Sequence, residues 1–193
     1  MKGTHIKLLE EFCENARSTF SNIDEAQLER VISAILRAKK IYVLGIGHSG
    51  MFGRILAMKL NHVGLRAYTV FDEINPPFEK DDLLIAISQS GETKTIVALA
   101  EKAIKLEGSV LGVTSEAEST LAKISETVLL IQKNADDVSF DVLSLMGDKN
   151  NQNFLGALFG FNIYILFYTI ILMIARKLNE TPESIDRRHA NLQ

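Results

Sequence analysis

Gly45-Ile46-Gly47-His48-Ser49-Gly50 and Ser88-Gln89-Ser90-Gly91-Glu92-Thr93 are two short polar loops that decide the fold of this chain. Each follows an apolar, β-branched run, at 41–44 and 83–87, and each precedes a helical pattern of apolar residues. Both loops therefore lie at the carboxyl ends of buried strands, where open α/β sheets bind ligands. Glycines let the backbone approach an anion closely, and helix N-terminal amides and hydroxyls donate hydrogen bonds to it. Together the loops predict a phosphate-binding cradle.

The first loop also matches a dinucleotide-binding pattern, but the residues around it do not fit a nucleotide. Its glycine spacing is that of the dinucleotide fingerprint, yet no acidic residue occurs between this loop and Asp72, so the position about 20 residues after the loop has no carboxylate to bind a ribose. A P-loop needs Gly-Lys-Ser or Gly-Lys-Thr, which the sequence lacks. The sequence therefore favours a smaller phosphate ligand.

The second loop carries three hydroxyls, on Ser88, Ser90 and Thr93, which suit a phosphate monoester better than a dinucleotide. The alternative for this loop is a helix N-cap formed by Ser90 or Gly91. Glu92 has two possible roles. Either its carboxylate reaches a substrate from the start of the helix, or it is a first-turn acid that only complements the helix dipole.

Strand and helix patterns alternate along most of the chain. The strands are expected at 41–45, 66–71, 83–88, 109–114 and 127–131, with helices at 50–63, 93–106 and 118–124 between them. Two amphipathic helices precede them at 6–20 and 23–38, the second capped by Ser21 or Asn22, and further helices follow at 154–189. Asn75-Pro76-Pro77 predicts a break before the third strand. The fold class is α/β, a three-layer α/β/α sandwich with a five-stranded parallel sheet, and residues 1–193 form one domain.

Composition narrows the functional classes. The chain has 193 residues, of which 47% are hydrophobic, which is enough to build one hydrophobic core. Its net charge is -3, so the composition gives no sign of the basic surface that binds nucleic acid. Cys13 is the only cysteine, and no His-x-x-x-His spacing occurs, so we expect no disulfide, metal or cofactor. The lack of an apolar signal at the N-terminus predicts a cytoplasmic protein.

The segment 154–175 has no formally charged side chain and is long enough to span a bilayer. A helix that is apolar all round also occurs where it is buried between subunits, and Gly156 and Gly160 have the spacing of close helix packing. We favour a homo-oligomer, a dimer or tetramer, over a membrane span. A membrane-associated sugar phosphate binder is the hypothesis that depends on this segment.

The two loops and their spacing resemble the SIS (sugar isomerase) domain family, from about residue 23 to the C-terminus. The stretch 78–84 and the tail Arg188-His189-Ala190-Asn191-Leu192 are most similar to the 6-phospho-3-hexuloisomerases of that family. The resemblance implies a flavodoxin-like parallel sheet that binds a small sugar phosphate, with active sites shared between subunits. It also implies that His189 is a catalytic acid or base in a neighbouring subunit's site.

The candidate residues follow from the loops and from this resemblance. Beside His189, the candidate catalytic residues are His48 and Glu92; His48 either opens the sugar ring or donates to the phosphate, or is only a hydrogen-bonded neighbour. The candidate substrate-binding residues are Gly47, His48, Ser49, Asp72, Ser88, Gln89, Ser90 and Thr93.

The chain departs from the family pattern at three positions. The isomerases carry Met-Gly-x-x-aromatic-Glu at the start of their long C-terminal helix, and the matching segment 155–160 ends in Gly160 where they have the glutamate. His48 stands where an arginine is usual, and Asp72 where a glutamate is usual. An alternative alignment through Met146-Gly147 places Asn151 or Gln152 near the glutamate position.

Two functions fit these observations. The first is an aldose–ketose isomerase of the 6-phospho-3-hexuloisomerase type that acts through a cis-enediol and needs one base, donors for the enediolate and an anchor for the phosphate. The second is a non-catalytic phosphosugar sensor or regulator that kept the cradle and lost the catalytic glutamate.

Overall fold

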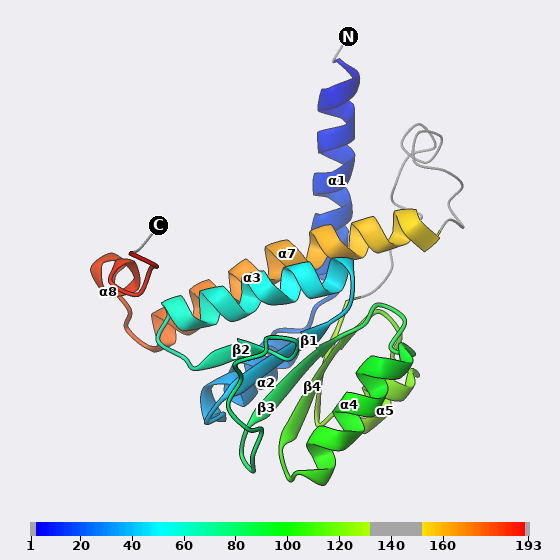
Figure 1. The fold of residues 1–193 in the computed structure, drawn as a ribbon. Coiled ribbons are helices and arrows are strands. Elements are labelled where there is room, and N and C mark those ends of the chain that lie inside the picture. The colour runs from blue at the N-terminus through cyan, green and yellow to red at the C-terminus, as the bar shows by residue number, and fades with distance from the viewer. Residues whose placement is uncertain (1–2, 132–151, 192–193) are drawn as a thin grey trace.

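A computed structural model of the protein describes residues 3–131 and 152–191 (Figure 1). Five parallel strands form one sheet, as the sequence predicts, and their order is β2-β1-β3-β4-β5. Their bounds are Ile41–Gly45 for β1, Ala67–Thr69 for β2, Leu83–Ile87 for β3, Ser109–Thr114 for β4 and Thr127–Leu130 for β5. Every residue of the central strand β3 is buried, which explains its unbroken apolar sequence because both faces of the sheet are covered.

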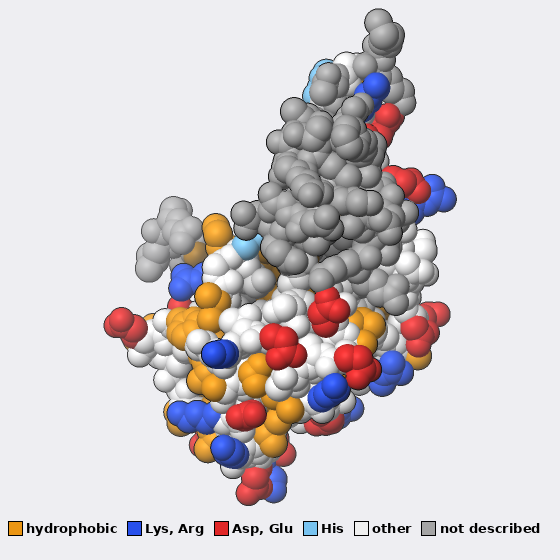
Figure 2. All heavy atoms as spheres, turned by 90° about the vertical axis from the view of Figure 1, so that its right-hand side faces the viewer, with side chains coloured by type: hydrophobic (Ala, Val, Ile, Leu, Met, Phe, Trp, Pro, Cys, Tyr) orange, Lys and Arg blue, Asp and Glu red, His pale blue; other side chains and the backbone are white. Residues whose placement is uncertain are grey.

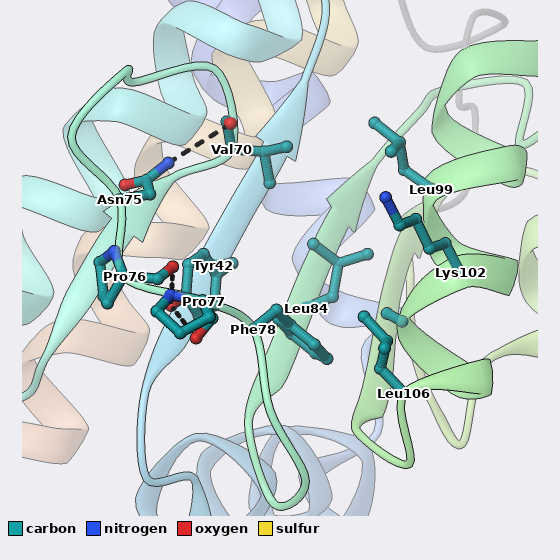
Figure 3. Close-up of a pocket in the computed structure, with 11 residues that line it drawn as sticks. Tyr42, Val70, Asn75, Pro76, Pro77, Phe78, Leu84, Leu99, Lys102 and Leu106 are labelled. Atoms are coloured by element: carbon teal, nitrogen blue, oxygen red, sulfur yellow. Dashed lines mark hydrogen bonds between the residues drawn. The ribbon is translucent and has the colours of Figure 1, made fainter.

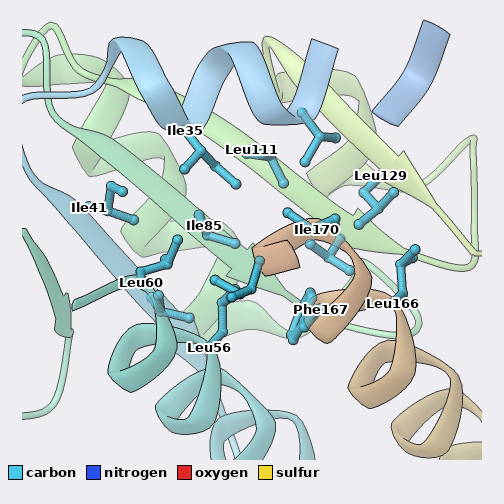
Figure 4. Close-up of a cluster of buried hydrophobic side chains, with 14 of the residues drawn as sticks. Ile35, Ile41, Leu56, Leu60, Ile85, Leu111, Leu129, Leu166, Phe167 and Ile170 are labelled. Atoms are coloured by element: carbon cyan, nitrogen blue, oxygen red, sulfur yellow. The ribbon is translucent and has the colours of Figure 1, made fainter. Parts of the chain in front are cut away.

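Helices cover both faces of the sheet and complete the three layers (Figure 1). The helices α2 (Glu25–Arg37), α3 (His48–His62) and α7 (Gln152–Lys177) pack on one face, where the larger core lies (Figure 4). The helices α4 (Lys94–Lys105) and α5 (Thr120–Ile124) pack on the other. Asp24, rather than Ser21 or Asn22, caps α2, because its carboxylate accepts from the backbone N–H of Ala26.

The remaining helices lie at the two ends of the chain. Helix α1 (Thr4–Ser21) projects from the body, and the C-terminal part of α1 contacts α7. Helix α8 (Pro182–Asp186) lies beyond the end of α7 (Figure 1). On the face shown in Figure 2, the Lys and Arg side chains are interspersed with Asp and Glu. That mixed distribution is unlike the basic stripe of a nucleic-acid-binding surface.

Helix α7 contains the uncharged apolar segment 154–175. Its part from Leu158 to Lys177 is long and apolar enough to cross a membrane by length and composition alone, but 56% of the apolar window is buried inside the protein. Asn162 is buried and donates to Asn15 Oδ1 and Thr19 Oγ1 of α1, each at 3.1 Å. This packing against α1, α2 and α3 favours a core helix.

The connection from β2 to β3 has no helix, as Asn75-Pro76-Pro77 predicts. The buried Lys40 holds this connection, since its ammonium donates to the Pro77 carbonyl at 2.7 Å and to Glu79 at 2.8 Å. It also lies 3.2 Å from the carboxylate of Asp82, whose side chain is fully buried. Lys40 therefore neutralises a buried charge and ties the connection to the start of β1.

Removing that ammonium should be costly. We expect Lys40→Met to lower the free energy of unfolding by about 3 kcal/mol, because it leaves the Asp82 carboxylate buried without a cation. Urea denaturation of both proteins measures the difference. Lys39→Met is the matched control, because the Lys39–Asp81 pair is solvent-exposed and its loss should change stability little. A loss for Lys40→Met as small as that for Lys39→Met would show that the buried Asp82 carboxylate does not depend on the Lys40 ammonium.

Candidate functional site

The two polar loops begin side by side, at the carboxyl ends of the neighbouring strands β1 and β3. β1 and β3 are neighbours, and Gly45 at the end of β1 pairs with Ile87 at the end of β3, so the loops start on strands about 4.8 Å apart. The first loop leads into α3 on one face, and the second leads into α4 on the other. The connections that follow β1 and β3 therefore run to opposite faces of the sheet. Open α/β sheets form a ligand-binding crevice between two such strands.

The first loop needs glycine for two different reasons. A Cβ atom on Gly45 would lie 2.8 Å from the backbone N of Gly50, so the strand and the first turn of α3 touch there. Gly47 adopts φ 59° and ψ -129°, a conformation that disfavours side chains, although a Cβ on it would meet no atom within 4 Å. Gly47 is also the N-cap residue of α3, and no side chain caps this end of the helix. The first-turn amides of α3, a turn that includes Ser49, therefore have no side-chain cap, and the space beside Gly47 is open.

The second loop is organised by its own hydroxyls. Ser88 is buried, its Oγ lies 3.0 Å from Thr93 Oγ1, and it accepts from the backbone N–H of Gly91 at 3.2 Å. Thr93, rather than Ser90 or Gly91, is the N-cap of α4, but its side chain caps no amide. Ser90 is exposed and accepts from the N–H of Glu92 at 3.3 Å. The loop thus leaves Ser90, Thr93 and the uncapped start of α4 available to a ligand, while the buried Ser88 holds the loop in shape through its hydrogen bonds.

Gln89 offers a further donor at the same place. Its backbone carbonyl accepts from the Ser115 N–H at 2.9 Å and from Thr114 Oγ1 at 3.0 Å, which fixes the residue against β4. Its side-chain Nε2 is buried and has no hydrogen-bond partner among the described residues. Buried polar groups are nearly always hydrogen-bonded in proteins. This amide is therefore suited to donate to a ligand or to water.

The carboxylate of Glu92 points to another helix. It accepts from the backbone N–H of Thr120 at 2.7 Å and from Thr120 Oγ1 at 2.9 Å, at the start of α5. The bond from the backbone amide and then that from the hydroxyl hold the pKa of Glu92 below its usual value. A carboxylate so engaged is a weak base, which favours the structural interpretation of this residue.

His48 lies where the first loop meets α7. Its ring is exposed and packs on the edge of Phe52, with the ring centroids 4.7 Å apart. A Cβ atom on Gly160 would lie only 2.7 Å from His48 Nδ1 and 2.7 Å from Phe52 Cε2. The imidazole of His48 therefore occupies the space that a side chain at position 160 would fill. The alternative alignment through Met146-Gly147 concerns side chains outside the described residues.

Asp72 lies on the far side of β1 from the second loop. It is exposed in the turn after β2, a strand that pairs only with β1, and its carboxylate is 3.7 Å from Arg54 of α3. Such an exposed, long ion pair is weak. The structure thus gives Asp72 no contact with the second loop.

His189 lies at the other end of α3 from the cradle. Its ring is T-shaped to that of His62, the last residue of α3, at 4.1 Å between centroids. Arg188 holds the tail there, since it donates to the His62 carbonyl at 3.1 Å and forms a bidentate pair with Glu180. His48 and His62 begin and end α3, which places them about 20 Å apart. Within one chain, His189 is therefore remote from the cradle.

Comparison with known proteins identifies the family of this chain. A family model described as the SIS domain matches residues 34–147. The chain belongs to the SIS domain family. This SIS domain is 32% identical over 166 residues to a 3-hexulose-6-phosphate isomerase of Methanocaldococcus jannaschii, covering 86% of this chain and 84% of that protein. It is 28% identical to the protein of that name from Bacillus subtilis, covering 95% of this chain and 96% of the other.

A solved structure supports the same relationship. A Methanococcus jannaschii protein, for which its structure infers a 3-hexulose-6-phosphate isomerase function, is 29% identical with a TM-score of 0.79, over 97% of this chain and 99% of that one. The SIS domain and the five-stranded fold predicted from the sequence are confirmed, and the three relatives described above carry the name or the inferred function of a 3-hexulose-6-phosphate isomerase. Among the described residues, no group of three His, Cys, Asp or Glu side chains is placed to hold a metal ion.

Proposed function

We propose that this SIS domain is a sugar phosphate isomerase of the 3-hexulose-6-phosphate isomerase type, which moves a carbonyl between adjacent carbons through a cis-enediol. The observation that carries the proposal is the pair of loops at the crevice between β1 and β3, each leading into an uncapped helix. The names of the relatives support the same substrate class. Incubation with 3-hexulose 6-phosphate, followed by NMR detection of the isomeric ketose phosphate, tests it.

The phosphate anchor would be the second loop. Ser90, Thr93 and the start of α4 would bind the phosphate, and the buried Nε2 of Gln89, which has no partner among the described residues, would add a donor. Gly47 and Ser49, in the first loop, would line the sugar. Ser88 would contribute mainly by holding Thr93 and the Gly91 amide in place.

Substitution of the exposed hydroxyls tests the anchor. Changing Ser90 and Thr93 together to Ala removes two neutral hydrogen bonds, each worth about 0.5–1.5 kcal/mol, so sugar phosphate affinity should fall about fivefold to a hundredfold. Calorimetry measures the affinity, and the hydroxyl of Ser115, in the turn after β4, provides a matched control through Ser115→Ala. Adding Ser88→Ala should abolish binding, and circular dichroism would show whether the fold persists. Unchanged affinity in both variants would place the phosphate elsewhere.

The proton transfer would fall to His48. Its ring is exposed beside the cradle, whereas Glu92 is engaged by Thr120 and Asp72 faces Arg54. An imidazole has an unperturbed pKa near 6.5, so histidine suits proton abstraction near neutral pH. The ring also fills the space over Gly160, where the resembling isomerases carry a glutamate. His48 would therefore perform the role of the missing carboxylate.

His189 would act from a second copy of the chain. It is about 20 Å from the cradle of its own chain, so only a neighbouring subunit could bring it to a site. We therefore propose a homo-oligomer, a dimer or tetramer, with shared active sites, in the cytoplasm. The sensor hypothesis is the alternative that the same experiments decide.

A further inference from the structure

A cavity lies on the α4 face of the sheet, away from the cradle. The loop from β2 to β3 and the C-terminal half of α4 enclose about 390 Å³, a volume within the usual range of small-molecule sites (Figure 3). Lys102 lines it nine residues beyond Thr93, which separates it from the start of α4 by about 13 Å. The cavity exists because a loop, rather than a helix, connects β2 to β3 and leaves this part of the sheet open.

The wall of the cavity is held in place by hydrogen bonds. The Tyr42 hydroxyl lies 3.0 Å from the Pro76 carbonyl and 3.1 Å from the Pro77 carbonyl, to which it donates (Figure 3). Asn75 Nδ2 donates to the carbonyl of Thr69 at 2.6 Å, and Lys40 Nζ donates to the Pro77 carbonyl at 2.7 Å. The loop is therefore fixed before any ligand arrives, which lowers the entropy cost of binding.

The lining is apolar, with one charge. The rings of Tyr42 and Phe78 are 5.2 Å apart and tilted, and Leu84 of β3 lies beside them (Figure 3). Lys102 is the one charged residue of the lining, its side chain is exposed, and none of the ion pairs between described residues includes it. An aromatic wall favours a flat apolar group, and a free ammonium favours an anion.

We propose that this cavity binds a flat, apolar small molecule with one anionic group, such as an aromatic carboxylate or sulfonate. The ring system lies against Tyr42 and Phe78, and the anion lies on Lys102. The site differs from the sugar phosphate cradle in place and in chemistry, so it does not depend on the proposed isomerase function.

The dye 1-anilinonaphthalene-8-sulfonate has this chemistry and serves as the probe. We expect one saturable site per chain, seen as a rise in dye fluorescence. Lys102→Glu should weaken the affinity about tenfold, because it replaces an attraction to the sulfonate by a repulsion. Lys105→Glu makes the same change of net charge one turn further along α4, outside the lining, and should leave the affinity within about twofold.

Two further measurements locate the dye and test the need for an anion. The neutral analogue N-phenyl-1-naphthylamine should bind with the same affinity to the wild type and to Lys102→Glu. Because the chain contains no tryptophan, Leu106→Trp puts a single reporter at the rim, and bound dye should quench its emission by energy transfer. Absence of dye binding, equal effects of Lys102→Glu and Lys105→Glu, or an unquenched reporter would each overturn the proposal.

Discussion

Substitution of His48 by Ala is expected to reduce the isomerase turnover number about 100-fold to 10,000-fold, with little change in sugar phosphate affinity. The expected loss follows from the position of this imidazole, which belongs to the first loop and borders the cradle. Steady-state kinetics and calorimetry measure turnover and affinity separately. His5→Ala removes the same side chain from the exposed end of α1 and is the control.

The contact between His48 and Gly160 allows a sharper form of this test. Gly160→Glu alone should also lower turnover, because its Cβ would collide with the imidazole and with Phe52. In the double variant His48→Ala, Gly160→Glu, the imidazole is gone, so only the contact with the Phe52 ring remains, and a carboxylate stands where the resembling isomerases have one. Turnover should then recover at least about tenfold relative to His48→Ala.

The double-mutant comparison has a clear contrary result. If the two substitutions reduce turnover independently, so that the double variant is worse than either single one, the imidazole and a carboxylate at position 160 do not share a role. Wild-type turnover in His48→Ala would remove His48 from the mechanism altogether. His189 would then be the next base to test.

The second large effect concerns the C-terminal tail. His189→Ala should reduce turnover about 100-fold to 10,000-fold while sugar phosphate affinity stays close to that of the wild type. The cradle of each chain would depend on the tail of another chain, because α3 separates the two within one chain. Light scattering without detergent should therefore show a dimer or tetramer.

Mixed oligomers distinguish the two arrangements of the site. In a dimer of one His48→Ala chain and one His189→Ala chain, one shared site keeps both wild-type histidines, so activity should return. If each site used only its own chain, no site in the mixed dimer would be complete and activity would stay at the level of the single variants. A monomer in solution would also contradict the shared site.

The fold follows closely from the sequence because its signals are local. The apolar runs before the two loops predict β1 and β3, and the alternation of strand and helix patterns predicts the parallel sheet. The bounds of individual elements are less exact. The second strand ends at Thr69 instead of continuing to 71, and the chain then enters the connection to β3 that contains Asn75-Pro76-Pro77. Asn75 binds the Thr69 carbonyl there and ends the strand.

The candidate site was predictable only in part, because its decisive contacts join distant segments. The spacing of the loops predicts a cradle, but it does not show that Glu92 binds Thr120 across the loop after β4. The contact of His48 with Gly160 spans more than half of the chain, and the position of His189 depends on how the tail packs on α3. Two departures from the family pattern, at 48 and at 160, were the signal available in the sequence; only the structure shows that they touch.

Solvent deuterium exchange tests the central claim most directly. The wild-type protein is incubated with 3-hexulose 6-phosphate in D2O, and NMR follows the hydrogens on the carbons beside the carbonyl. An enediol intermediate predicts that deuterium enters at those carbons, at a rate that falls with His48→Ala. Tight binding of the sugar phosphate with no deuterium incorporation would contradict an isomerase and identify the protein as a phosphosugar sensor.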